Sequence, residues 1–216
     1  MPGPDPRSPD RPQAAADPCL PAPPPLIHQG VPEALRPVAA ALYWRHFGAQ
    51  ILPMPVAARH GVALIRTAMR PEQALVALSP AGDLLGILGL RDARGGFLDP
   101  ARHSFVAVWG PAGGRLRHLS TALCRPGGTT GDLVLDGLAV PPRWRRQGIA
   151  RALVGAAAEL ARSRGHAGLR AEVAADNHTA LSAWRALGFV ALHRQRQGWP
   201  WTAPAHVLRL AVAPSR

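Results

Sequence analysis

The sequence predicts one domain with a mixed α/β fold behind a short N-terminal tail. From residue 133 onward, strand and helix patterns alternate and end in two consecutive strand patterns, which is typical of α/β and α+β folds with a mixed sheet. Earlier, two apolar runs at 74–79 and 84–90 flank turn residues and predict a hairpin. The 216 residues, with a hydrophobic fraction of 47% and a charged fraction of 18%, fit a folded globular protein.

The N-terminal tail is predicted to span residues 1–30. This stretch holds ten of the 24 prolines and little apolar content before Leu26, which predicts a disordered or polyproline-like tail. Removing the first 25 residues is therefore not expected to abolish activity. A proline-rich ligand for a partner domain is the alternative interpretation. The predicted domain covers residues 31–216.

The first half of the domain gives weak signals apart from the hairpin. A helix is predicted over 32–47, opened by Pro32 and Glu33. The region from 95 to 131 is the least regular, and a helix is expected near residues 116–124. The apolar run LVLDGLAV at 133–140 predicts a strand.

The second half gives sharper signals. Apolar residues from Ile149 to Leu160 recur at spacings of four, three and four, which predicts a helix that ends before Gly165. Residues 169–173 alternate apolar and charged side chains and predict a strand. A further helix shows the apolar face Leu181, Trp184 and Leu187. Residues 189–194 and 205–212 predict the last two strands.

The charge of the chain points to anionic ligands without naming one. The formal charge is +12, and all 25 basic residues are arginine. GC-rich codon usage is one explanation, and nucleic-acid binding is another. The arginines are scattered and few aromatic residues lie among them, so nucleic acid is an unfavoured partner. A basic surface would still attract an anionic coenzyme.

The segment LAVPPRWRRQGIA, residues 138–150, carries the clearest chemical signal. A strand ends at Val140, a basic loop follows, and Gly148 precedes a helix. The first turn of a helix presents unpaired N–H groups and a positive dipole end, and glycine lets a ligand approach the backbone. This arrangement predicts a cradle for a pyrophosphate group.

Other catalytic motifs are missing from the sequence. A Walker loop needs a lysine, and the chain has none; the dinucleotide fingerprint G-x-G-x-x-G and the hydrolase motif G-x-S-x-G are also missing. The histidines form no HxxxH or H-E-x-x-H pattern, so no metal cofactor is expected. Cys19 and Cys124 are too few for a disulfide framework. No signal peptide and no apolar run of membrane-spanning length is found, and a cytoplasmic location is expected.

Two motifs resemble those of the GNAT superfamily of acyl-CoA-dependent N-acyltransferases. The signature [RQ]-x-x-G-x-[GA] is matched by Arg145, Gly148 and Ala150. The run NHTALSAWRALGF, residues 177–189, resembles the family's second motif, N-x-x-A-x-x-x-[YF]-x-x-x-G-F. The resemblance covers residues 31–213, most closely 131–190. It implies a GNAT-like fold with splayed central strands flanked by helices.

The resemblance also implies a site for acetyl-CoA. Pantetheine would lie between two splayed strands beside Leu138 and Val140, and the amides from Arg145 to Ala150 would hold the pyrophosphate. Asn177 would contact pantetheine or stabilise the gap, although it could also be a plain helix cap. The residues assigned to the coenzyme in this way are Leu138, Ala139, Val140, Arg145, Arg146, Gln147, Gly148, Ile149, Ala150 and Asn177.

The catalytic groups are harder to assign. The family often uses a tyrosine of the second motif to protonate the leaving thiolate, but this chain has Trp184 there. Water could protonate the thiolate, the thiolate could leave unprotonated, or the site could be inactive. As general base, Asp136 is expected first, with its side chain pointing the same way as those of Leu138 and Val140. Glu172 is second, although neighbouring Arg170 suggests a solvated face.

The predicted function is transfer of an acetyl group from acetyl-CoA to a primary amine by direct attack in a ternary complex. The acceptor could be a protein amine, a polyamine, an antibiotic or an amino acid. The main alternative is a non-catalytic module that binds acyl-CoA as a sensor.

Overall fold

One eight-stranded sheet organises the fold of the described part of the chain. The structure is a computed structural model that describes residues 24–212, so residues 1–23 of the predicted tail lie outside the described residues. The strands are β1 (Leu26–Gln29), β2 (Ala74–Leu78), β3 (Leu84–Asp92), β4 (Gly95–Gly96), β5 (Leu133–Ala139), β6 (Gly168–Ala174), β7 (Val190–Gln195) and β8 (Ala205–Ala211). Their order is β1-β2-β3-β5-β6-β8-β7, with β4 added beside β3.

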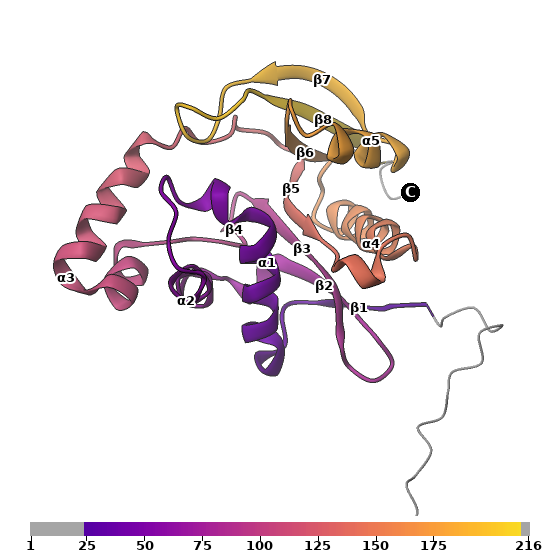
Figure 1. Ribbon diagram of the computed structural model, residues 1–216. Coiled ribbons are helices and arrows are strands. Elements are labelled where there is room, and N and C mark those ends of the chain that lie inside the picture. The colour runs from indigo at the N-terminus through magenta and orange to yellow at the C-terminus, as the bar shows by residue number, and fades with distance from the viewer. Residues whose placement is uncertain (1–23, 213–216) are drawn as a thin grey trace, which may run out of the picture.

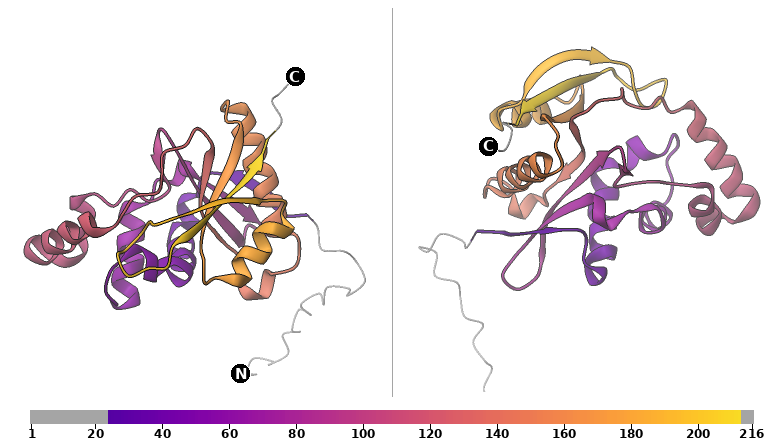
Figure 2. Two further views of the ribbon diagram at one scale, coloured as in Figure 1. Left: turned by 90° about the horizontal axis from the view of Figure 1, so that it is seen from above. Right: turned by 180° about the vertical axis from the view of Figure 1, so that it is seen from behind.

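Helices cover both faces of the sheet (Figures 1 and 2). They are α1 (Arg36–Ile51), α2 (Ala58–Ala68), α3 (Arg102–Ser120), α4 (Ile149–Ser163) and α5 (His178–Ala186). One apolar cluster joins α4 and α5 to the sheet through Leu153, Leu181 and Leu88, and a second joins α1 and α2 to the other face. Helix α3 lies outside α2, away from the sheet (Figure 1). The predicted α/β class with a mixed sheet is confirmed.

The later half of the domain matches its prediction closely. The hairpin is β2 and β3, and the predicted strand at 133–140 is β5. Helix α4 begins at Ile149, as its apolar spacing indicates, and α5 presents Leu181 and Trp184 to the core.

Three expectations for the first half are corrected. Residues 26–29 belong to the sheet and not to the tail, because β1 pairs antiparallel with β2 from Leu26–Leu78 to Gln29–Leu75. The helix expected at 32–47 starts with a 3-10 turn at Glu33–Leu35, and α1 continues to Ile51. The helix expected near 116–124 is the end of α3, which begins at Arg102 and is interrupted at Gly110, where φ is 73° and Pro111 follows.

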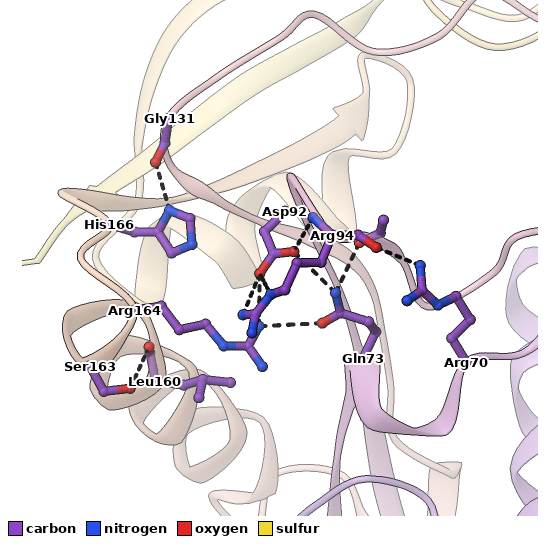
Figure 3. A network of polar contacts seen from close by, with 10 residues as sticks. Arg70, Gln73, Asp92, Arg94, Gly131, Leu160, Ser163, Arg164 and His166 are labelled. Atoms are coloured by element: carbon purple, nitrogen blue, oxygen red, sulfur yellow. Dashed lines mark hydrogen bonds and ion pairs between the residues drawn. The ribbon is translucent and has the colours of Figure 1, made fainter.

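A polar network ties the far end of β3 to α4 (Figure 3). The buried carboxylate of Asp92 accepts hydrogen bonds from the guanidinium groups of Arg94 at 2.8 Å and Arg164 at 3.0 Å, and from Gln73 Nε2 at 3.1 Å. Burial alone would raise the pKa of Asp92, but the hydrogen bonds from Arg94 and Gln73 outweigh it and hold that pKa far below its usual value. The network therefore fixes the packing of α4 against the hairpin.

No helix in the 24–212 range is both long enough and apolar enough to cross a membrane.

Candidate active site

Strands β5 and β6 form a fork in the middle of the sheet. Their parallel pairing runs from Leu133–Leu169 to Leu135–Ala171 and stops there. Beyond that point β5 still pairs with β3 up to Ala139, and β6 still pairs with β8 up to Ala174. The two strands therefore part while each keeps its outer neighbour. The half-buried side chains of Leu138 and Val140 lie on the arm of the fork that β5 contributes and pack against the α4 side of the core.

The turn between β5 and α4 is open. A 3-10 turn at Pro142–Trp144 follows the strand, and α4 begins after Gly148. Gly148 has φ 78°, a left-handed conformation that glycine adopts without strain. A Cβ placed at Gly148 would have no heavy atom within 4 Å. Among residues 24–212, no side chain therefore occupies the space beside the Cα atom of Gly148.

The amides at the start of α4 have no hydrogen-bond partner in the described part of the chain. Within residues 24–212, no backbone carbonyl or side chain accepts a hydrogen bond from the amides of Arg146 to Arg151. Arg146 is also left-handed, with φ 59°, which is rare for a residue with a side chain. Successive amides in such a turn, at the positive end of a helix, form an anion-binding nest. The residues expected to hold a pyrophosphate thus have the backbone for it.

Arg145 differs from the rest of this run. Its own amide donates to the carbonyl of Pro142 at 3.3 Å, so the free amides begin one residue later than expected. Its guanidinium turns back, with Nε donating to the Val140 carbonyl at 3.1 Å and a terminal nitrogen 3.3 Å from His46 Nε2. Arg145 therefore links the fork, the basic loop and α1. The exposed side chains of Arg143 and Arg146 remain at the surface of the loop.

Two residues of the second motif have structural roles. The Asn177 side chain caps α5 by accepting from the Ala180 amide at 3.0 Å. Trp184 is 9% exposed and packs edge-to-face on Phe189 with ring centroids 4.9 Å apart. Because its indole lies in the α4–α5 core, Trp184 does not replace the tyrosine of the family motif as an acid.

A bulge places Asp136 at the fork. Gly137 pairs with Gly89 and Leu135 pairs with Leu90, so Asp136 is an extra residue in β5. The expected side-chain direction is wrong for this reason. Asp136 points to the α1 side, toward Arg91 and β4, whereas Leu138 packs on the opposite face. The bulged carbonyl of Asp136 accepts from the buried Tyr43 hydroxyl at 3.0 Å.

Glu172 lies across the fork from Asp136, on β6. Its carboxylate forms an ion pair with Arg170 at 2.7 Å and accepts hydrogen bonds from Gln195 at 3.1 Å and from Arg91 at 3.4 Å. The expectation of a solvated face at Arg170 and Glu172 is wrong, because both side chains are less than 10% exposed. The loop that follows α3 covers them, and a Cβ at Gly127 would lie 2.7 Å from the Glu172 carboxylate.

The carboxylates of Asp136 and Glu172 differ in how many of their oxygens accept a hydrogen bond from the described residues. Every described donor to Asp136 reaches Oδ1, where Arg91 Nε binds at 2.8 Å, and the side chain is 21% exposed. Glu172 has donors on both oxygens. Burial raises the pKa of Asp136, Arg91 opposes that rise, and the nearby charge of Glu172 adds to it. Asp136 is thus the carboxylate better suited to accept a proton.

Arg91, Gln195 and Tyr43 were not predicted as site residues. Arg91 directly follows the apolar run of β3. A charged residue at the end of such a run does not indicate which carboxylates it will bind. Gln195 and Tyr43 reach the site from β7 and α1, and only the fold brings these segments together. In residues 24–212 no group of His, Cys, Asp or Glu side chains is arranged to hold a metal ion.

The fork between β5 and β6 and the left-handed turn before α4 are the two backbone features that characterise this site. Residues 62–189 match the family model described as Acetyltransferase (GNAT) family, and the chain therefore belongs to that family. The predicted resemblance is confirmed. No curated protein matches the sequence significantly.

Solved structures share the fold at low sequence identity. An N-acetyltransferase from Staphylococcus aureus Mu50 has a TM-score of 0.63 and 16% identity, over 86% of this chain and 100% of that one. A protein described as an acetyltransferase has a TM-score of 0.57 and 18% identity, over 87% and 100%. A GCN5-related N-acetyltransferase from Kribbella flavida has a TM-score of 0.53 and 16% identity, over 87% and 97%. At these identities the likeness establishes the fold alone.

Proposed function

We propose that the protein transfers an acetyl group from acetyl-CoA to a primary amine by direct attack in a ternary complex. The observation that carries this proposal is the fork between β5 and β6 next to the unpaired amides around Gly148. Strand edges that part can accept an extended pantetheine arm, and the nest accepts a diphosphate. Membership of the GNAT family supports the same assignment.

The coenzyme fits the residues that are present. The diphosphate would be bound by the amides of Arg146, Gln147, Gly148, Ile149 and Ala150, and pantetheine by the strand edge from Leu138 through Ala139 to Val140. When bound, acetyl-CoA supplies the activated acetyl group as a thioester. Arg143 and Arg146 add positive charge at the rim of the turn.

Asp136 is the proposed general base. An amine attacks only when it is neutral, so a proton must leave it directly or through a water molecule. Asp136 has one carboxylate oxygen without a described donor, while Glu172 is held on both oxygens. We assign protonation of the leaving thiolate to water, because Trp184 is a core residue.

The first test is binding. Acetyl-CoA at about 100 times its dissociation constant should stabilise the fold by about 2.7 kcal/mol, and for a chain of this size that raises Tm by about 5–10 °C. Calorimetry then gives the affinity. Absence of both signals would contradict the proposal.

The second test separates an enzyme from a sensor. Release of free thiol is measured with acetyl-CoA and a panel of polyamines, amino acids, aminoglycosides and peptide amines. Turnover with any of them supports the transferase. Tight coenzyme binding without turnover across the panel would favour a regulatory acyl-CoA-binding module.

A further inference from the structure

One guanidinium joins the two strands at the point where they part. Arg91, on β3, donates from Nε to Asp136 on β5 at 2.8 Å and from a terminal nitrogen to Glu172 on β6 at 3.4 Å. The last β5–β6 pair, Leu135–Ala171, directly precedes both carboxylates in sequence. We propose that Arg91 is a positioning residue that clamps the fork and orients the Asp136 carboxylate. This inference rests on the proposed function, because it gives Asp136 its role.

The charges around Asp136 explain why the clamp matters. The titratable groups that face it are Arg91 from β3, Glu172 from β6 and Tyr43 from α1. Arg91 is the one cation among them. Arg170 is committed to Glu172 at 2.7 Å and to Gln195 at 2.9 Å. Without Arg91, Asp136 would be a poorly hydrated carboxylate facing another carboxylate, and both effects favour its protonated form.

The geometry also requires an arginine. A guanidinium presents several donors in one rigid plane, so it can bind two carboxylates on different strands at once. A lysine has a single charged nitrogen and would bind one carboxylate well and the other poorly. Two glycines leave room for the pair: a Cβ at Gly96 would lie 2.8 Å from Asp136 Oδ2, and one at Gly127 would lie 2.7 Å from Glu172.

The experiment compares variants by the pH dependence of kcat/KM. Arg91→Met should move the acidic limb to higher pH, with a loss at neutral pH smaller than the roughly 10²–10⁴-fold loss expected on removal of a general base. Arg91→Lys should recover part of that shift. Glu172→Gln should move the limb the other way, to lower pH, because it removes a neighbouring negative charge.

The matched control is Arg209→Met. Arg209, on β8, binds Asp132, the residue before β5, at 2.7 Å and is 32% exposed, close to the 33% of Arg91. It should leave the acidic limb in place. An unmoved limb in Arg91→Met, or equal shifts in Arg91→Met and Arg209→Met, would overturn the proposal.

A second readout does not need turnover. The Asp136 carboxyl carbon is titrated by NMR in labelled protein, with Asp136→Asn used to assign the signal. Arg91→Met should raise the titration midpoint and Glu172→Gln should lower it. If no amine is acetylated by the wild type, the proposed function fails while this titration still tests the clamp. If Arg91→Met does not fold, the two other variants test the clamp. The titration midpoint of Asp136 should then rise in Arg91→Lys and fall in Glu172→Gln. Unchanged midpoints in both variants would contradict the clamp.

Discussion

Asp136 and Glu172 carry the same functional group in different surroundings. Asp136 sits in a bulge with one carboxylate oxygen bound to Arg91, while Glu172 is held by Arg91, Arg170 and Gln195. The pKa of Asp136 is raised by burial, which favours a group that gains a proton during turnover. At the scale of single residues, the different surroundings of the two carboxylates are the reason for proposing Asp136 as the base.

Asp136→Asn should lower kcat by about 10²–10⁴-fold, because a positioned base is lost. Stability should not fall with it. A carboxyl whose pKa is raised in the folded state costs stability as pH rises from the unfolded pKa through the folded one, and a neutral amide removes that cost. The measurement is kcat beside Tm at neutral pH, with calorimetry as a control for coenzyme affinity. A large loss of Tm, or unchanged kcat, would contradict this role.

The sequence pointed to Asp136 as a candidate base but predicted the wrong face of the sheet for its side chain. Strict alternation along β5 predicts that Asp136 and Leu138 share a face, and one extra residue at the bulge reverses that. A bulge depends on the pairing with β3, which the pattern of a single strand does not encode. Arg91 and Tyr43 were missed for a related reason, since their roles arise only when β3 and α1 pack beside β5.

At the scale of elements, the turn into α4 is the part of the chain that we propose binds the diphosphate of the coenzyme. Gly148→Val should weaken acetyl-CoA binding at least about tenfold, a free energy of about 1.4 kcal/mol, because a β-branched residue at φ 78° is strained and places side-chain atoms in the open nest. Calorimetry measures the dissociation constant.

The matched control is Gly155→Ala within α4. A Cβ there also meets nothing within 4 Å, but φ is not in the left-handed range. Alanine favours the helix by up to about 1 kcal/mol over glycine, so Tm should rise slightly and affinity should hold. Equal acetyl-CoA affinity in Gly148→Val and Gly155→Ala would show that the turn does not bind the coenzyme.

Long periodic elements were predictable and interrupted ones were not. Helix α4 has a regular apolar spacing and α5 has a capping Asn177, and both begin where the sequence places them. Helix α2 was missed although it is strongly amphipathic, and α3 is broken by Gly110 and Pro111. Helix α3 packs mainly on α2 and not on the sheet, so its sequence shows no continuous apolar face.

At the scale of the whole molecule, the Asp92 network holds α4 against the hairpin. Asp92→Ala should destabilise the fold by about 3 kcal/mol, because it leaves the 13%-exposed Arg164 without its carboxylate. The Glu159→Ala variant is the control, since Glu159 pairs with Arg162 at the surface of α4 and such pairs contribute less than about 1 kcal/mol. Denaturant unfolding measures both changes.

The pH dependence of the Asp92 effect has a definite sign. The folded pKa of Asp92 lies below its unfolded value, so its stabilisation is complete above the unfolded pKa and is lost as pH falls toward the folded one. The difference between wild type and Asp92→Ala should therefore shrink below about pH 4. A difference that stays constant down to acid pH would contradict the network's electrostatic role.

Strand β1 is the first strand of the sheet within residues 24–212. A variant lacking residues 1–25 should keep the Tm and coenzyme affinity of the full chain, because the first strand in the described part of the chain begins at Leu26. A variant lacking residues 1–30 removes β1 and its pairing with β2, and should have a clearly lower Tm. Equal stability of the two truncations would show that β1 is dispensable.

The most direct test of the whole account is an amide NMR titration of the labelled protein with acetyl-CoA. The account predicts that the largest shifts fall on the amides of Arg146 to Arg151 and along Leu138 to Val140, with little change in α2 and α3. Binding that shifts other amides and leaves the Gly148 turn unchanged would contradict it.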